Sequence, residues 1–207
     1  AEGRTDGLLD KSTLAQPSGI TVSGTRLYFA DSEVSSIRYV DLEKKEVKTV
    51  VGLDLFVFGD ADGQGDEVRL QHPLGVFNHN GLVYIADTYN HRIKVLNPLD
   101  RTCRTFAGNG KAGYVDGKDA RFYEPGGLSI ARNKLYVADT NNHAIRVIDM
   151  KTKEVSTLQI KGLKMEVSEN TPQSVIPSFA RPIELPLKTL KMGSDIQLTL
   201  NINLPKG

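Results

Sequence analysis

Short runs of apolar residues recur along the first 160 residues of the chain at a fixed spacing. The run LYFAD at 27–31 returns as VYIAD at 83–87 and as LYVAD at 135–139. Six residues after each closing aspartate stands an isoleucine, and a basic residue follows it. Each run also ends fourteen residues after a proline, and these prolines are Pro17, Pro73 and Pro125. Self-similarity of this kind indicates a protein built from structural repeats.

Each repeat unit contains four short runs rich in β-branched and aromatic residues, separated by turns of Gly, Asn, Asp and Lys. This pattern predicts a four-stranded antiparallel meander, with strands at 18–23, 26–31, 36–41 and 46–51 in the first unit. A single sheet of this kind cannot cover both of its faces and has to stack on neighbouring sheets. A period of roughly 50 residues with four strands and no helix is typical of a β-propeller blade. The predicted fold class is therefore all-β, made of β-propeller blades.

The repeat region is expected to span residues 1–162, with blades at about 17–52, 73–108 and 125–160. Three blades do not close a ring, because propellers typically carry about four to eight. Either the missing blades lie upstream, or two copies of this chain pair into one ring. Residues 163–186 lack strand periodicity and gather four prolines, which predicts a linker. Alternating apolar and polar residues within 187–207 predict the start of a truncated C-terminal β domain, with docking onto the propeller as the alternative.

The charge of the chain is nearly balanced, with 26 basic and 25 acidic residues. No global field therefore attracts it to nucleic acid or to an anionic membrane, and neither partner is expected. No apolar run approaches the roughly 20 residues that a membrane-spanning helix needs. The one cysteine, Cys103, cannot form an intrachain disulfide and has no CxxC partner, so we expect a structural role and a reducing compartment.

The recurring aspartates Asp31, Asp87 and Asp139 resemble a catalytic set only in their regular spacing. Each follows a predicted strand and precedes a turn, where an aspartate carboxylate commonly accepts backbone N–H groups in an Asx turn. We therefore expect them to fix chain reversals. His91 and His143 recur in the same way, but equivalent positions of adjacent blades lie too far apart to share a metal ion.

The run from residue 60 to 66 imitates a calcium-binding loop. Its candidate metal ligands are Asp60, Asp62 and Asp66, at loop positions 1, 3 and 7. The imitation fails at position 12, where Gln71 replaces the bidentate glutamate, and no flanking helices are expected. Because Asp-Gly pairs recur at 6–7 and 116–117, a glycine turn is the simpler interpretation. We expect no catalytic residue, no metal and no cofactor in this chain.

Two segments, ADTYNH at 86–91 and ADTNNH at 138–143, resemble the NHL repeat, and the corresponding ADSEVS at 30–35 departs from it. The stretch from 58 to 76 and the segment 124–128 are similar to the NHL-repeat-containing protein 2 group, to which plant suppressor-of-quenching proteins are related. The resemblance implies a thioredoxin-like domain, a six-bladed NHL propeller and a C-terminal β-stalk. The chain would then hold the last three of the six blades, half of the ring, and the start of the stalk, without the thioredoxin-like domain.

The resemblance also implies which residues belong to the repeat structure. They are Pro17, Gly19, Asp31, Pro73, Gly75, Asp87, Asn90, His91, Pro125, Gly127, Asp139, Asn142 and His143. The function we expect is a non-catalytic protein-interaction scaffold within a thioredoxin-like/NHL multidomain protein. Its partners would be proteins of unknown identity and the upstream blades. Animal members imply a cytoplasmic location, and plant members imply the thylakoid lumen.

Two other function classes remain open at this stage. An RNA-binding propeller would use recurring positive charge, here at Arg38, Arg92, Lys94 and Arg146, but aromatic residues do not interleave with these bases. A metal-dependent propeller enzyme would need ligands near the inner strands, where His79 stands alone. The scaffold is favoured because a regular framework is evident and a reaction centre is not.

Overall fold

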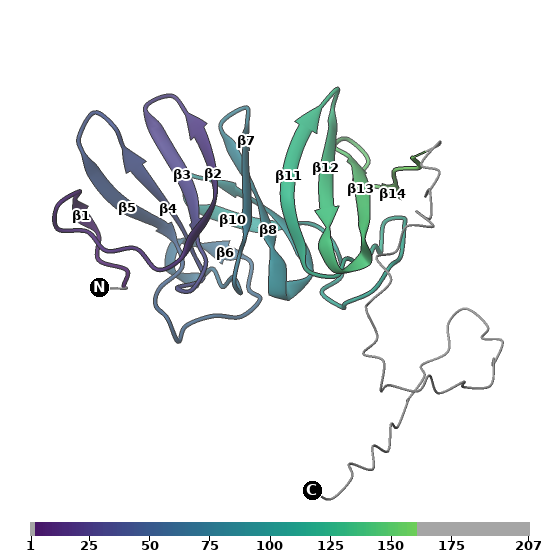
Figure 1. Cartoon of the computed structure of the whole chain (residues 1–207), viewed down its shortest axis with the longest axis horizontal. Coiled ribbons are helices and arrows are strands. Elements are labelled where there is room, and N and C mark those ends of the chain that lie inside the picture. Colours follow the sequence, from purple (N-terminus) through teal and green to yellow (C-terminus); the bar gives the residue numbers. More distant parts are fainter. Residues whose placement is uncertain (1–2, 161–207) are drawn as a thin grey trace, which may run out of the picture. The chain divides into compact units, whose positions relative to one another are not determined.

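The computed structural model describes residues 3–160, which form three antiparallel sheets that follow one another along the chain (Figure 1). Blade 1 contains β1 (Gly7–Leu8), β2 (Pro17–Ser23), β3 (Arg26–Asp31), β4 (Ser36–Asp41) and β5 (Glu46–Val51). Its strands lie in the order β1-β5-β4-β3-β2, so the four long strands form a meander. The strands predicted for the first repeat are confirmed, with β2 beginning one residue earlier than expected.

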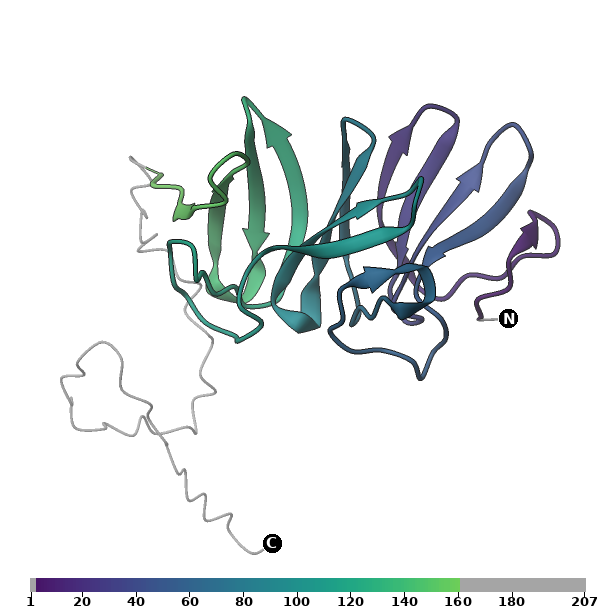
Figure 2. The same ribbon diagram turned by 180° about the vertical axis from the view of Figure 1, so that it is seen from behind.

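The other two sheets repeat this topology. Blade 2 contains β6 (Gly63–Gln64), β7 (Gly75–His79), β8 (Leu82–Asp87), β9 (Arg92–Asn97) and β10 (Thr102–Ala107). Blade 3 contains β11 (Pro125–Ala131), β12 (Lys134–Asp139), β13 (Ala144–Asp149) and β14 (Val155–Thr157). Three 3₁₀ turns complete the described region, η1 (Gly65–Glu67), η2 (Thr88–Asn90) and η3 (Thr140–Asn142). The segments that join one blade to the next lie at the lower end of the sheets in Figures 1 and 2.

The segments between blades take part in the sheets, which the four-strand prediction did not anticipate. β1 pairs with β5, and β6 pairs with β10, so each of the first two blades gains a fifth strand at its outer edge. In blade 3 the same place is taken by an isolated bridge between Gly117 and Val155. The three Asp-Gly pairs therefore mark where each incoming segment joins the outermost strand of its own blade.

The blades stack through opposite faces. We define the front face by the positions of Tyr28, Ala30, Ile37 and Val50, and the back face by those of Val76, Val83, Ile85, Leu96 and Cys103. These two sets form one buried cluster between blades 1 and 2. A second cluster joins the front face of blade 2 to the back face of blade 3 in the same way. Burial of these apolar faces is the main force that holds the blades together.

The inner strands β2, β7 and β11 lie side by side and approach each other closely. The backbone N–H of Gly19 donates to the carbonyl of Leu74 at 2.7 Å. A Cβ atom on Gly75 would collide with the carbonyl of Gly126. Gly19 and Gly75, each two residues after its blade-opening proline, therefore permit close backbone approach between neighbouring blades.

The predictions for the linker 163–186 and the C-terminal β domain 187–207 fall outside the described residues. The same holds for the expected β-stalk. None of the helices within residues 3–160 is long and apolar enough to cross a membrane.

Candidate functional site

A fully buried ion pair lies at the lower end of blade 1. Oδ2 of Asp31, at the end of β3, accepts a hydrogen bond from Nη1 of Arg38 on β4 at 2.6 Å. The other carboxylate oxygen of Asp31 accepts the backbone N–H of Ala15 at 2.7 Å. Nη2 of Arg38 donates to Asp6, whose carboxylate in turn accepts both the N–H and the hydroxyl of Thr49 on β5. One polar network thus links β3, β4, β5 and the segment that precedes β2.

Blade 3 contains the same network at equivalent positions. Asp139 and Arg146 form the buried pair at 2.7 Å, and Asp139 also accepts the N–H of Tyr123. Arg146 reaches Asp116 at 2.7 Å, and Asp116 is bound by the N–H and hydroxyl of Thr157. The repeated use of these contacts in two blades indicates a structural device of the repeat.

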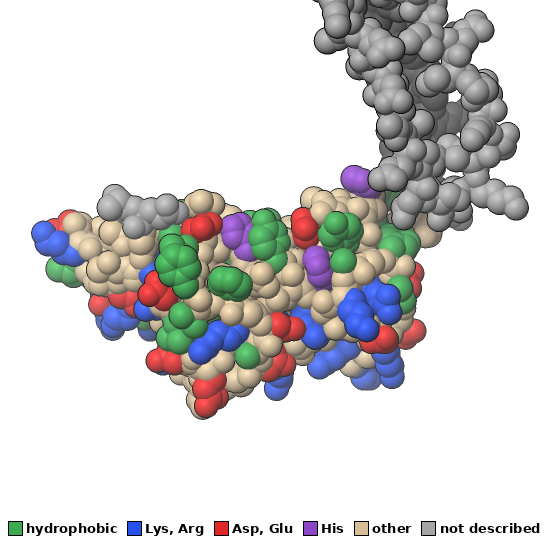
Figure 3. All heavy atoms as spheres, turned by 90° about the horizontal axis from the view of Figure 1, so that it is seen from below, with side chains coloured by type: hydrophobic (Ala, Val, Ile, Leu, Met, Phe, Trp, Pro, Cys, Tyr) green, Lys and Arg blue, Asp and Glu red, His purple; other side chains and the backbone are tan. Residues whose placement is uncertain are grey.

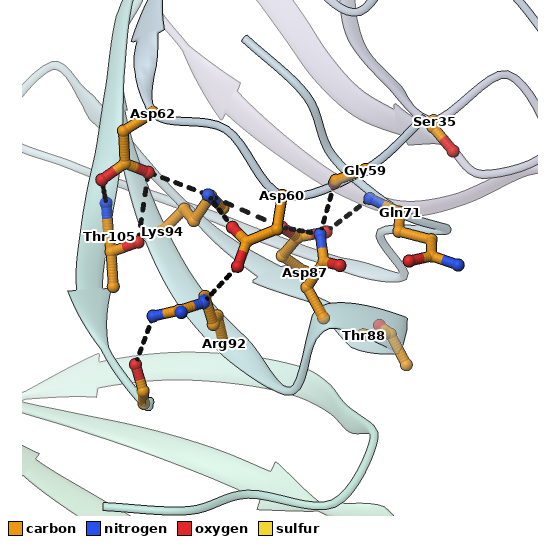
Figure 4. A network of polar contacts seen from close by, with 12 residues as sticks. Ser35, Gly59, Asp60, Asp62, Gln71, Asp87, Thr88, Arg92, Lys94 and Thr105 are labelled. Carbon is orange, nitrogen blue, oxygen red and sulfur yellow. Dashed lines mark hydrogen bonds and ion pairs between the residues drawn. The ribbon is translucent and has the colours of Figure 1, made fainter. Parts of the chain in front are cut away.

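Blade 2 differs because a lysine replaces the arginine (Figure 4). Nζ of Lys94 lies 4.0 Å from the buried Asp87 and instead donates to Asp62 at 2.8 Å and to Asp60 at 2.7 Å. Asp60 also accepts Nε of Arg92 at 2.6 Å. The extra carboxylate of Asp60 stands where blades 1 and 3 have Arg4 and Tyr114. Asp60 thus supplies an anionic partner to Lys94, which does not reach Asp87 as an arginine would.

The longer separation leaves Asp87 without a close cation. Burial raises the pKa of Asp87 to about 7, although the Asn90 amide and the Gln71 N–H oppose the change. Burial alone would lower the pKa of Lys94, but its hydrogen bonds to Asp60 and Asp62 raise it above the ordinary value. Near neutral pH the lysine is therefore charged, and Asp87 holds a proton for part of the time.

The asparagine of the NHL motif completes the network in two blades. Nδ2 of Asn90 donates to Asp87 at 2.8 Å and to the carbonyl of Gly59 at 2.6 Å. Asn142 makes the same pair of contacts to Asp139 and to the carbonyl of Gly113. In blade 1 this position is Val34, which cannot donate. In blades 2 and 3 the motif aspartate and asparagine thus connect the loop before the blade to the turn between its second and third strands.

The expectation that these aspartates form Asx turns was wrong. Their carboxylates bind the backbone sixteen residues upstream, because the segment before each blade runs beside the end of its second strand. Asx turns instead follow the third strand of each blade, where the side chains of Asp41, Asn97 and Asp149 accept N–H groups two or three residues ahead. These backbone hydrogen bonds lower the pKa values of Asp41 and Asp149.

The three candidate calcium ligands are directed to cations of the protein. Asp60 and Asp62 bind Lys94, whereas Asp66 pairs with Arg101 at 2.5 Å. Because the third carboxylate turns to a different cation, the three do not converge on one point. Within residues 3–160 no three His, Cys, Asp or Glu side chains gather as a metal site would require.

The histidines have local structural roles. His91 and His143 adopt left-handed backbone conformations that end η2 and η3. Nδ1 of His91 accepts the N–H of Glu124 from the next blade at 3.2 Å. His72 stacks on Tyr89 with ring centroids 4.7 Å apart and also has a positive φ of 48°, so it is both a packing and a turn residue. The ring of His79 lies within hydrogen-bond distance of the side-chain amide of its neighbour Asn80.

Cys103 is buried in the cluster between blades 1 and 2. Burial raises the pKa of its thiol to about 12, so thiolate is scarce near neutral pH. The structural role expected for this cysteine agrees with its position.

The recurring basic residues do not form a basic surface. Arg38, Lys94 and Arg146 have no exposed side-chain area and are paired with aspartates. Arg92 is partly exposed but pairs with Asp60. The positive charge considered for RNA binding is therefore neutralised inside the blades, which corrects the assumption that it faces solvent.

An aromatic surface lies at the lower end of the blades, which we call the loop face. It comprises Phe58, His72 and Tyr89, which line one hollow, and the exposed Phe56 two residues before Phe58. Phe56 is 84% exposed, and Phe58 and Tyr89 are about half exposed. Figure 3 shows hydrophobic side chains gathered next to histidines on this side. This surface is not evident from the repeat pattern, because Phe56 and Phe58 do not recur in the other units.

Two hollows lie along the loop face. One of about 180 Å³ is lined by Phe58, His72, Tyr89 and Glu33 among others. The other, of about 300 Å³, is lined by Leu55, Val34, Asp54 and Glu33 among others. Glu33 and Leu55 line both, so the hollows adjoin. Glu33 and Asp54 form no salt bridge within residues 3–160, and Arg4 lines the second hollow beside them.

The fold, the repeated polar network and its sequence together define the class of protein. The NHL repeat model matches residues 70–96 and 122–148, so the chain carries NHL repeats, and its sheets have the arrangement of β-propeller blades. The sequence is 40% identical over 229 residues to NHL repeat-containing protein 2 of Bos taurus, covering 100% of this chain and 32% of that relative. It is also 43% identical over 216 residues to Protein SUPPRESSOR OF QUENCHING 1, chloroplastic, of Arabidopsis thaliana, covering 95% of this chain and 20% of that protein. The predicted resemblance is confirmed.

The chain spans about a third of the length of the NHL repeat-containing protein 2 relatives that it matches. Among solved structures it is similar to an auxiliary nutrient binding protein from Bacteroides ovatus, with a TM-score of 0.58 and 23% identity over 72% of this chain and 39% of that one. A protein of unknown function from Bacteroides thetaiotaomicron gives a TM-score of 0.54 at 23% identity over 59% and 32% of the two chains. At these identities the similarity concerns the fold alone.

Proposed function

We propose that the chain is a non-catalytic protein-interaction scaffold that belongs to a thioredoxin-like/NHL multidomain protein. The observation that carries the proposal is the loop face, where exposed aromatic side chains line a groove on a rigid framework. Tyrosine and other large aromatic residues are common anchors of protein interfaces, whereas soluble proteins seldom expose several together without a function. The non-catalytic part is supported by the buried aspartates and bases, which are engaged with each other.

The partner chemistry follows from the groove. Its walls combine apolar and polar side chains, and two carboxylates there, Glu33 and Asp54, form no salt bridge with a described residue. A segment that inserts an apolar or aromatic side chain and carries a lysine or arginine beside it would complement both features. We therefore propose a basic, apolar peptide segment as the bound element.

The test is selection of random twelve-residue peptides, displayed on phage, against the purified chain. Enriched peptides should combine apolar and basic residues. Their affinity should fall about tenfold or more for Phe58→Ser, because loss of a central aromatic contact commonly costs over about 1.4 kcal/mol. Leu99→Ser is the matched control, since Leu99 is 87% exposed on another part of the surface. Failure to enrich any peptide, or equal binding to both variants, would contradict the proposal.

A further inference from the structure

Part of the groove on the loop face is bound directly to the buried Asp87 (Figure 4). Gln71 lines the hollow of about 180 Å³, and its backbone N–H donates to Oδ1 of Asp87 at 2.8 Å. Tyr89 lines the same hollow, and its N–H donates to the carbonyl of Gln71 at 3.1 Å. The amide of Asn90, the next residue, donates to Oδ2 of Asp87 at 2.8 Å. The carboxylate of Asp87 therefore holds the loop before blade 2 against η2.

Phe58, a third residue that lines the hollow, is connected to the same carboxylate. The amide of Asn90 that binds Asp87 also donates to the carbonyl of Gly59 at 2.6 Å, and Gly59 directly follows Phe58. One NH₂ group thus makes both hydrogen bonds. Asp87 and Asn90 together therefore set the distance between the segment that carries Phe58 and the turn that carries Tyr89.

The hydrogen bonds on Asp87 suit an ionised carboxylate. Both come from N–H donors, and the third polar group nearby, Nζ of Lys94, lies 4.0 Å away and is also a donor. A protonated carboxyl has to donate one hydrogen bond, which none of these groups accepts in its present orientation. Asn90 would accept it by turning its amide so that Oδ1 faces Asp87, and its NH₂ group would then leave the carbonyl of Gly59. A proton taken from solvent by Oδ2 therefore breaks the connection to the groove.

The surroundings of Asp87 place this proton uptake near neutral pH. Burial raises the pKa of Asp87 to about 7. In blades 1 and 3 an arginine donates directly to the equivalent aspartate. Of the three blades within residues 3–160, blade 2 alone combines the asparagine link with a cation that stays 4.0 Å from the carboxylate. The titratable or charged groups around it are Lys94 on β9, Asp60 and Asp62 on the incoming segment, the Cys103 thiol on β10, and the loop residues His72 and His91.

We propose that Asp87 is a positioning residue for the groove, and that its protonation detaches the Phe58 segment from the η2 turn and weakens peptide binding there. The peptide in this inference is the one in the proposed function, on which that part rests. Only a proton moves, from solvent to Oδ2 of Asp87 and back. Binding is therefore strongest when the carboxylate is ionised, and it decreases as pH falls through about 7.

The first test needs no peptide. In NMR spectra of the full 207-residue chain, the backbone amide signal of Gly59 should shift between about pH 5.5 and about pH 8.5, with a midpoint near 7. Asp87→Asn should abolish this shift. Lys94→Arg should move the midpoint lower by at least about one pH unit, because a guanidinium reaches the equivalent aspartate in the other blades. Gly113, the equivalent of Gly59 in blade 3, should not shift.

Histidine also changes charge in this pH range, and His72 lines the groove, so His72→Gln is the matched control. It should leave the midpoint of the Gly59 signal unchanged. A Gly59 signal that does not titrate would overturn the proposal. A midpoint that moves in His72→Gln but stays the same in Lys94→Arg would also overturn it, because the groove would then respond to the imidazole.

The second test measures the affinity of the tightest-binding selected peptide that lacks histidine, by calorimetry at pH 6 and pH 8. The wild-type chain should bind it about fivefold or more weakly at pH 6 than at pH 8. Asp87→Asn, which imitates the protonated carboxyl, should bind at pH 8 as weakly as wild type does at pH 6. Lys94→Arg should keep the tighter affinity at both values.

The two tests separate this inference from the proposed function. Equal wild-type affinity at pH 6 and pH 8 would overturn the inference and leave the groove as a peptide site. Failure to select any peptide would contradict the proposed function, and the titration of Gly59 would then still decide whether Asp87 positions the groove.

Discussion

The carboxylate of Asp31 and the guanidinium of Arg38 lie 2.6 Å apart with no exposure to solvent, although one ends β3 and the other lies within β4. The β3–β4 register places Asp31 opposite Ser36, so Arg38 lies two residues further along on the same side of the sheet. Removing two charges from water is costly, and their attraction offsets that cost only while both remain. The pair therefore makes blade 1 sensitive to loss of either member.

Replacing Arg38 by methionine should lower the free energy of unfolding by about 3–5 kcal/mol, because Asp31 would remain as a buried, uncompensated charge. Urea denaturation at a fixed protein concentration measures this. Lys44→Met, at an exposed turn, should change stability by less than ~0.5 kcal/mol. The double variant Asp31→Asn/Arg38→Met should lose less than the sum of the single variants. Simple additivity would show that the two residues do not interact.

Asp87 should give blade 2 a distinctive dependence on pH. Its folded-state pKa, about 7, exceeds the ordinary 3.8, so the folded chain keeps a proton that the unfolded chain releases. The stability contributed by this group is complete below pH 4 and is lost as pH rises through 7. Asp87→Asn should therefore gain stability relative to wild type between pH 4 and 8 in urea denaturation. A carboxyl titration midpoint below 5 by NMR would refute the assignment.

Cys103 should resist thiol reagents in the folded chain. Its thiol is buried and its pKa is raised to about 12, so both access and thiolate formation are suppressed. Reaction with Ellman's reagent should be slow in buffer, complete within minutes in denaturing urea, and follow the unfolding transition between these limits. Immediate labelling of the native chain would show that blades 1 and 2 separate readily.

Gly75→Ala and Gly127→Ala form a matched pair at the same repeat position. A Cβ on Gly75 would collide with the carbonyl of Gly126, whereas a Cβ on Gly127 meets only Ala138 at 3.9 Å. Gly75→Ala should cost about 1–3 kcal/mol through overpacking. Gly127→Ala should leave the thermal unfolding midpoint of the chain unchanged, because the added Cβ has room. Equal destabilisation by both variants would contradict this account.

The strands and their repeat could be predicted from sequence because alternation and turn residues act locally. The spacing of seven residues from each recurring aspartate to its base was also visible. Their pairing was missed because it depends on hairpin register, and Asp31 was assigned to a turn from its position at a strand end. The register that places Asp31 opposite Ser36 brings Arg38 to the same side of the sheet, and the sequence alone does not give this register.

The rest could not be predicted, because it depends on segments without periodicity. Asp60 resembled a calcium ligand, and only its contact with Lys94 shows that it compensates for the change from arginine to lysine. Phe56 and Phe58 lie in the segment between blades 1 and 2, and the corresponding segment between blades 2 and 3, residues 109–114, carries no phenylalanine. The position of Phe58 beside Tyr89 follows from the path of that segment across two blades.

Hydrogen–deuterium exchange of the chain, with and without the tightest-binding selected peptide, tests the scaffold function most directly. Bound peptide should slow exchange in the segment 53–58 and in η2, because these form the walls of the groove. Exchange in β12 and β13, remote from the groove, should stay unchanged. Protection confined to the front face of blade 3, or no protection of 53–58, would contradict the claim that the loop face is the binding surface.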